Sequence, residues 1–113
     1  MADPRPEVDV EEAERLLAAG AFLLDVREDD EWVAGHAPGA THVPLGQLEA
    51  QLDTLPRDRT IVCICRSGAR SGRATDALLP LGFDIVNLVG GSQAWAVSGR
   101  SFVTDAGTPG RVA

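Results

Sequence analysis

The segment at residues 60–80 constrains the possible folds of this chain more than any other part of its sequence. It begins with a short apolar run at 60–64 that is rich in β-branched side chains, a pattern typical of a buried strand in an α/β sheet. Apolar residues then recur between 74 and 81 with the spacing i, i+3, i+4 and i+7, which predicts a helix over 70–80. A buried strand that passes through a short loop into a helix is the repeating unit of a parallel sheet.

The rest of the chain alternates in the same way. We predict strands at 7–8, 21–26, 40–43 and 84–88, and helices at 10–19, 28–34, 45–52 and 92–97. Asp9 is suited to cap the first helix, because Glu12 follows three residues later. This alternation predicts a three-layer α/β/α fold around a central, mostly parallel sheet. A chain of 113 residues suits one domain, which we assign to residues 1–103, followed by a flexible tail at 104–113.

Cys65 is the candidate reactive residue. It directly follows the strand at 60–64, so it lies at the carboxyl edge of the predicted sheet, where ligands bind in parallel α/β folds. A loop that curls from a strand into a helix turns its backbone N–H groups inward, and Gly68 helps this loop to close tightly. Arg66 and Arg70 add two cations near the sulfur, so we expect a lowered pKa and a reactive thiolate. The alternative is a buried, inert cysteine beside two surface arginines.

Three motifs, in order along the chain, resemble those of one known family. Residues 65–70 read CRSGAR and are similar to the active-site loop of the rhodanese family, the single-domain sulfurtransferases, in which this loop begins with the catalytic cysteine. Residues 23–45 read LLDVREDDEWVAGHAPGATHVPL and resemble the family's upstream signature. Residues 81–95 read LGFDIVNLVGGSQAW and resemble its last strand, Gly-Gly turn and Trp-bearing helix. The resemblance covers residues 8–103, and three ordered motifs are far more specific than one.

The resemblance and the loop chemistry together predict a sulfurtransferase that works through a persulfide on Cys65. It would move a sulfane sulfur from thiosulfate or a related anionic donor to cyanide or a thiol, with no metal and no organic cofactor. We expect the donor and the persulfide to be bound by the loop residues, which are Arg66, Ser67, Gly68, Ala69 and Arg70. Asp25 and Arg27 end a strand at the same edge, so we expect them to orient the reactive loop through hydrogen bonds. The resemblance implies a scaffold role for His36, and the less favoured alternative is that it acts as a general base for Cys65.

Two other functions stay open at this point. Cysteine phosphatases and arsenate reductases have similar loops, but with the pattern C-x5-R. Here the arginine is Arg70, in a C-x4-R pattern, and the next position is Ser71, so the cradle is tighter and suits a single sulfur better than a phosphoryl group. The third hypothesis is a sulfur-carrying or regulatory module whose partner is another protein, with the acidic residues at 1–31 as its docking surface.

Charge is distributed unevenly along the chain. The net charge of -7 argues against nucleic acid and anionic membranes as partners. Residues 1–31 hold eleven acids and three arginines, whereas residues 57–73 hold five arginines and a single acid, Asp58. The local positive field around the reactive loop indicates a small anionic substrate.

Several features favour a reduced, cytoplasmic setting. The N-terminal residues are acids and prolines rather than a basic stretch followed by an apolar one, so we expect no signal peptide. No apolar run approaches the ~20 residues of a membrane span. The two cysteines form a C-x-C pair, which lacks zinc-site spacing and is too close for a relaxed disulfide. We expect Cys63 to pack inside its strand, with a role as a resolving thiol as the minor alternative.

Overall fold

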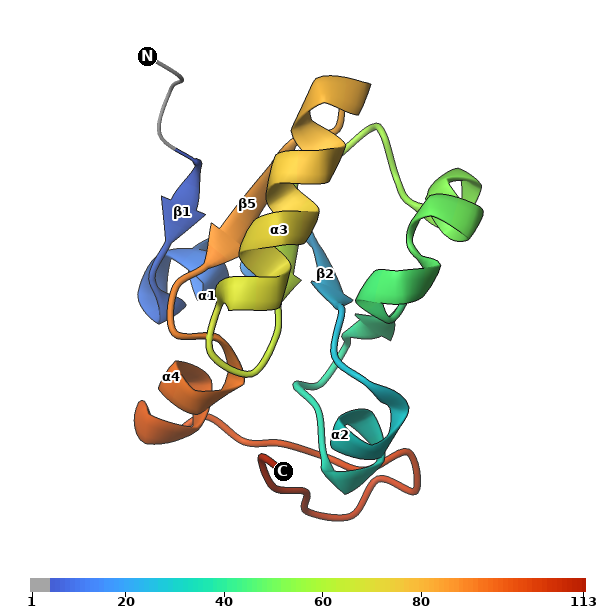
Figure 1. The fold of residues 1–113 in the computed structure, drawn as a ribbon. Coiled ribbons are helices and arrows are strands. Elements are labelled where there is room, and N and C mark those ends of the chain that lie inside the picture. The colour runs from blue at the N-terminus through green and yellow to red at the C-terminus, as the bar shows by residue number, and fades with distance from the viewer. Residues whose placement is uncertain (1–4) are drawn as a thin grey trace.

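The computed structural model describes residues 5–113, and the first four residues of the predicted domain lie outside the described residues. Within residues 5–113 there is one sheet of five strands, each parallel to its neighbours, in the order β1-β5-β4-β2-β3 (Figure 1). The strands are β1 (Glu7–Val8), β2 (Phe22–Asp25), β3 (Thr41–His42), β4 (Ile61–Ile64) and β5 (Ile85–Leu88). The strand that carries the reactive loop, β4, is therefore the central one.

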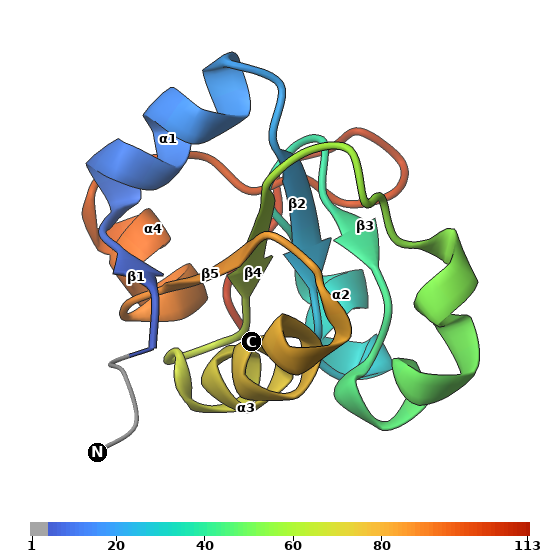
Figure 2. The ribbon, with the colours of Figure 1, turned by 90° about the horizontal axis from the view of Figure 1, so that it is seen from above.

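Helices cover both faces of this sheet, as Figure 2 shows. One face carries α1 (Val10–Ala18) and α4 (Gly91–Val97), and the other carries α3 (Ala69–Leu78). The short α2 (Asp29–Ala34) lies beyond the carboxyl ends of the strands, at the bottom of Figure 1. The predicted three-layer α/β/α fold with a central parallel sheet is confirmed.

Strand β4 contributes to the core on both faces of the sheet. All four of its residues are buried. Ile61 and Cys63 join the core beneath α3, whereas Val62 and Ile64 join the core beneath α1 and α4. Successive side chains of a strand point to opposite faces, so a strand buried on both faces reads as a continuous apolar run.

The segment predicted as one helix at 45–52 has a different form in the structure. It consists of two 3-10 helices, η1 (Leu45–Gln47) and η2 (Glu49–Thr54). Gln51 interrupts the second, with φ −121° and ψ 20°. Leucines at the spacing i, i+3 and i+7 align on one side of an α-helix, but the break at Gln51 divides this segment into shorter helices. Leu48 is still buried in the core beneath α3, and Leu45 and Leu52 pack against the same core.

The helix predicted over 70–80 begins at Ala69 and ends at Leu78, where a 3-10 turn, η3 (Leu79–Leu81), follows. Pro80 lies inside this turn and has no backbone N–H to continue an α-helical ladder. Leu81 is 48% exposed, so the last residue of the predicted apolar repeat does not enter the core.

The C-terminal segment runs back along α2 (Figure 1). Val103 and His36 exchange two backbone hydrogen bonds, and the Arg111 N–H donates to the Ala34 carbonyl, each with an N–O distance of 2.9 Å. The C-terminal segment approaches Gly35 so closely that a Cβ atom there would overlap the Arg111 backbone. These contacts attach the segment to the domain, and the flexibility of the tail at 104–113 stays a prediction.

Candidate active site

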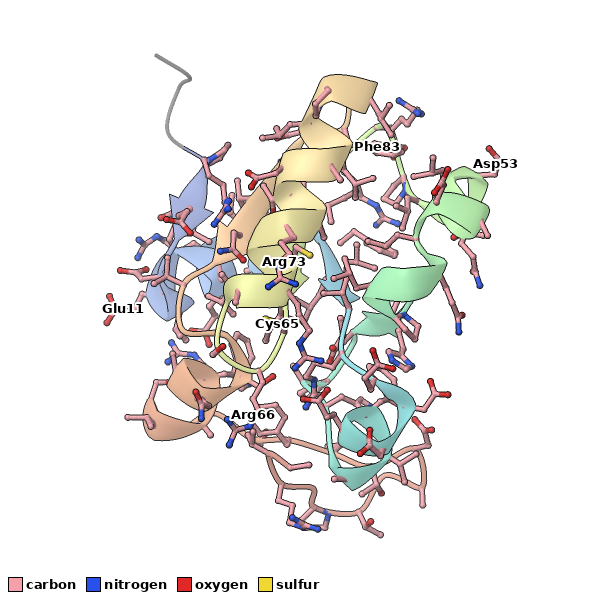
Figure 3. All side chains as sticks on the ribbon, in the orientation of Figure 1. Glu11, Asp53, Cys65, Arg66, Arg73 and Phe83 are labelled. Atoms are coloured by element: carbon pink, nitrogen blue, oxygen red, sulfur yellow. The ribbon has the colours of Figure 1, made fainter. Side chains whose placement is uncertain are left out.

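Cys65 lies immediately after β4, in the loop that leads into α3 (Figure 3). Its exposed fraction is 1%. The Gly68 N–H donates to Cys65 Sγ with an N–S distance of 3.0 Å. Gly68 has a φ of 103°, a left-handed conformation that suits glycine, and it caps α3. The sulfur therefore lies at the N-terminus of a helix, whose partial positive charge stabilises an anion.

The turn that follows β5, together with the start of α4, forms backbone hydrogen bonds with the reactive loop. The backbone N–H groups of Ser92 and Gln93, in α4, donate to the carbonyls of Cys65 and Arg66 at 2.7 and 3.0 Å. A Cβ atom at Gly91 would overlap the Cys65 carbonyl, so glycine is required for this approach. The Gly-Gly turn of the sequence thus allows α4 to satisfy the loop carbonyls.

The pKa of the Cys65 thiol is lowered from its ordinary value. Burial by itself raises this pKa, but the Ser71 hydroxyl and the backbone N–H groups of Ser71, Gly68 and Ser67 outweigh it. Ser71 Oγ lies 3.3 Å from Cys65 Sγ. The lowered pKa of Cys65 and the part of the loop N–H groups are as we expected, whereas the Ser71 hydroxyl was not expected and the arginine charges are not among the main causes.

Ser71 contacts the sulfur of Cys65, and the sequence did not predict this contact. In the sequence, Ser71 stands at the position where the C-x5-R pattern of the phosphatases has arginine, and this pattern predicts no role for a serine. In the structure it is the third residue of α3 and is 0% exposed. The available signal was its position in the first turn of the helix that begins at the loop, where a hydroxyl can reach the sulfur.

Arg70 is held by α2. Its two terminal nitrogens donate to the two carboxylate oxygens of Glu31, at 2.6 and 2.8 Å. These hydrogen bonds are the main reason that the pKa of Glu31 falls from 4.5 to about 2. The side chains of Glu31 and Arg70 are 14% and 27% exposed, so the pair is close to solvent. The cation that the sequence placed beside the sulfur therefore has a carboxylate partner.

The other predicted loop residues face outward. Arg66, Ser67 and Ala69 are exposed. The Arg66 Nε donates to the Ala113 carbonyl at 2.9 Å. Figure 3 shows Arg66 below Cys65, on the outer side of the loop.

Asp25 and Arg27 form a buried ion pair at the end of β2. Arg27 donates to the Asp25 carboxylate at 2.9 to 3.1 Å and to the Gly35 carbonyl at 2.8 Å. The Arg27 backbone N–H also donates to Asp25, at 3.0 Å. These hydrogen bonds fix the connection between β2 and the end of α2, rather than the loop at 65–70 as we had expected. The physical reason is proximity: Gly35 ends the helix that directly follows Arg27.

His36 belongs to an aromatic stack at α2. The Trp32 ring stacks on the rings of His36 and His42, with centroid distances of 3.5 and 4.7 Å. His36 Nδ1 lies 3.1 Å from the Trp32 carbonyl, and Nε2 lies 3.4 Å from the Asp105 carboxylate. These contacts attach His36 to α2 and to the C-terminal segment, and its scaffold role stays a prediction.

Cys63 packs next to the site, on the same face of the sheet as Cys65. It is fully buried, and this burial, followed by the nearby Cys65, raises its pKa well above the ordinary value. Within residues 5–113, no group of three or more His, Cys, Asp and Glu side chains is placed to hold a metal ion. In the same part of the chain, no helix has the length and apolarity that a membrane span requires.

Sequence comparisons place the chain among known proteins. The family model described as the Rhodanese-like domain matches residues 9–98. A protein of Allochromatium vinosum named Sulfurtransferase is 36% identical over 104 residues, which cover 89% of this chain and 97% of the relative. Bacillus subtilis YrkF, whose name proposes a sulfur carrier, is 36% identical over 93 residues, which cover 80% of this chain and 50% of YrkF.

Solved structures agree with the sequence relatives. A rhodanese-related protein from Thermoplasma volcanium has a TM-score of 0.83 at 30% identity, and the match covers 88% of this chain and 99% of that one. Reduced CoADR-RHD from Bacillus anthracis has a TM-score of 0.80 at 30% identity, over 85% of this chain and 18% of that one. The chain belongs to the family of rhodanese-like domains.

Proposed function

We propose that this chain is a sulfurtransferase that carries sulfane sulfur as a persulfide on Cys65. The observation that carries the proposal is the setting of Cys65 Sγ, which accepts the Gly68 N–H at 3.0 Å at the N-terminus of α3. Such a position favours a charged sulfur. The names of the relatives support sulfur transfer in general. Thiosulfate as donor and cyanide or a thiol as acceptor are the specific part of the proposal.

Both half-reactions balance without an external oxidant or reductant. The Cys65 thiolate attacks the outer sulfur of thiosulfate, a new S–S bond forms, and the S–S bond of the donor breaks as sulfite leaves with the electron pair. Cyanide then attacks the outer sulfur of the persulfide, thiocyanate leaves, and the thiolate returns. A thiol acceptor would leave as a persulfide.

The loop residues have distinct parts in this scheme. The backbone N–H groups of Ser67 and Gly68 and the hydroxyl of Ser71 stabilise negative charge on the sulfur. The exposed Arg66 and the Glu31-bound Arg70 attract the oxyanion of the donor. The N–H of Ala69, at the first position of α3, adds to the positive end of the helix dipole, while Asp25 and Arg27 hold the adjoining turn.

A sulfur carrier is the second candidate, and the similarity to YrkF favours it. The same persulfide would form on Cys65, but its acceptor would be another protein. A Cys65 that loads rapidly and turns over slowly with every small acceptor would support the carrier.

The experiment that tests the proposal is the intact mass of the reduced protein after brief exposure to thiosulfate. We expect the gain of one sulfur atom, reversed by cyanide, in the wild type and in the matched control Cys63→Ala, and no gain in Cys65→Ser. Sulfur loading that persists in Cys65→Ser would contradict the proposal. So would the absence of loading together with Cys65-dependent hydrolysis of an aryl phosphate.

A further inference from the structure

A chain of hydrogen bonds begins at Cys65 and runs through Ser71 and Asn87 toward β1. Ser71 Oγ lies 3.3 Å from Cys65 Sγ and 2.5 Å from Asn87 Oδ1. Ser71 and Asn87 are 0% and 2% exposed, so water does not replace these contacts. Asn87 is on β5, the strand beside β4, so it approaches the sulfur from the interior of the sheet.

The orientation of the Asn87 amide is fixed by its other neighbours. Asn87 Nδ2 donates to Glu7 Oε2 at 2.9 Å and to the Gly68 carbonyl at 3.2 Å. Both partners accept hydrogen bonds and cannot donate them, so the amide nitrogen must face them. The Asn87 carbonyl is therefore directed at Ser71.

This arrangement gives the Ser71 hydroxyl two acceptors and only one proton to donate. When Cys65 is a thiol, all contacts can be satisfied: the S–H donates to Ser71 Oγ, and the Ser71 O–H donates to Asn87 Oδ1. When the thiol proton leaves to solvent, the thiolate needs the Ser71 proton as well. If the hydroxyl turns to the sulfur, the buried Asn87 carbonyl loses its donor, which carries a free-energy cost.

We propose that Asn87 is a positioning residue that competes with Cys65 for the Ser71 proton and so favours the thiol form of Cys65. It acts against the loop N–H groups, which favour the thiolate. Glu7, on β1, contributes by holding the amide of Asn87 in place. The inference goes beyond sulfur transfer, because it concerns the protonation of Cys65 whatever the thiolate attacks.

Other charged or titratable groups lie on the elements that neighbour the loop of Cys65, and the test must hold their charges constant. The acids are Glu7 on β1, Asp25 at the end of β2 and Glu31 on α2. The other groups are Arg27 after β2, Cys63 on β4, Arg66 in the loop and Arg70 on α3. Asn87 carries no charge, so replacing it by alanine leaves all of these charges unchanged.

The test measures the pH dependence of Cys65 alkylation by iodoacetamide, read by peptide mass spectrometry, in Asn87→Ala, Ser71→Ala and the double variant. Without the Asn87 carbonyl, the Ser71 proton is free for the thiolate, so we expect an about fivefold larger thiolate fraction below the midpoint in Asn87→Ala. In the Ser71→Ala background the same substitution should change nothing, because no hydroxyl remains to be positioned. Alkylation needs no sulfur donor, so its outcome is independent of the proposed function.

A smaller or unchanged thiolate fraction in Asn87→Ala would overturn the proposal. An equal shift in both backgrounds would also overturn it, since a distortion of the loop would not depend on Ser71. If Asn87→Ala does not fold, NMR of the wild-type protein provides the test. The side-chain amide resonances of Asn87 should shift with pH, with the same midpoint as Cys65 alkylation. Amide resonances that do not respond at that midpoint would refute the competition for the Ser71 proton.

Discussion

Two arginine–carboxylate pairs lie near the reactive loop, and they differ in their surroundings. The side chains of Asp25 and Arg27 are 1% and 0% exposed, whereas those of Glu31 and Arg70 are 14% and 27% exposed. A buried charge that loses its partner remains desolvated and uncompensated, whereas a charge near solvent can be rehydrated. We therefore expect the buried pair to act as part of the framework of the fold, and the charges of the pair closer to solvent to be the ones that can respond to a bound anion.

The largest effect is expected from breaking the buried pair. Asp25→Asn leaves the Arg27 cation inside the protein without a carboxylate, so the free energy of unfolding should fall by about 3–5 kcal/mol. Denaturant unfolding measures this change. The double variant Asp25→Leu with Arg27→Met is the control, because it removes both charges and should regain most of the loss. A loss below about 1 kcal/mol in Asp25→Asn would mean that the buried pair contributes no more to stability than an ion pair near solvent.

A smaller loss is expected from the pair near solvent. Glu31→Gln removes the carboxylate that binds Arg70 bidentately, and solvent screening limits the loss in unfolding free energy to about 1–2 kcal/mol. Asp30→Asn is the matched control, since Asp30 is an exposed acid in the same helix turn. Its loss should be only a few tenths of a kcal/mol, from the helix dipole. Equal losses in the two variants would show that Arg70 contributes nothing to stability.

The contribution of the Glu31–Arg70 pair to the free energy of unfolding should depend on pH. The hydrogen bonds from Arg70 lower the folded-state pKa of Glu31 from 4.5 to about 2. The stabilisation from this pair is therefore complete above the unfolded-state value and is lost as the pH falls through about 2. Unfolding measured between neutral and acidic pH should show the wild type and Glu31→Gln converging at the acidic end. A stability difference that stays constant as Glu31 becomes protonated would contradict this assignment.

The framework was predictable from sequence because it depends on local patterns. Each of three correct predictions depended only on a short stretch of chain: the strand at 60–64, the Asp9 cap and the helix after Gly68. The structure has the corresponding strand, cap and helix. The 3-10 helices were not predicted, because the spacing of Leu45, Leu48 and Leu52 indicates that these side chains pack on the core but not that the helix breaks at Gln51.

The details of the site were less predictable because they depend on contacts between distant segments. The sequence identified Arg70 as a cation beside the loop, but its partner Glu31 lies 39 residues away. Likewise, the hydrogen bond from Asn87 to Glu7 spans 80 residues and forms only because β1 and β5 are paired. Composition and spacing report which side chains are present, and the strand order decides which of them meet.

The smallest expected effect concerns the chemistry of the pair near solvent, given the proposed function. In Glu31→Gln, Arg70 keeps its charge but loses the carboxylate that neutralises it, so an anionic donor should bind better and the KM for thiosulfate should fall about two- to threefold. Steady-state kinetics over a range of thiosulfate concentrations measures this, with Asp30→Asn expected to leave KM unchanged and Arg70→Gln to raise it. A KM that rises in Glu31→Gln would mean that the carboxylate is needed to orient Arg70 toward the donor. In that case a pair near solvent would be as rigid a part of the framework as the buried pair, and exposure would not separate their roles.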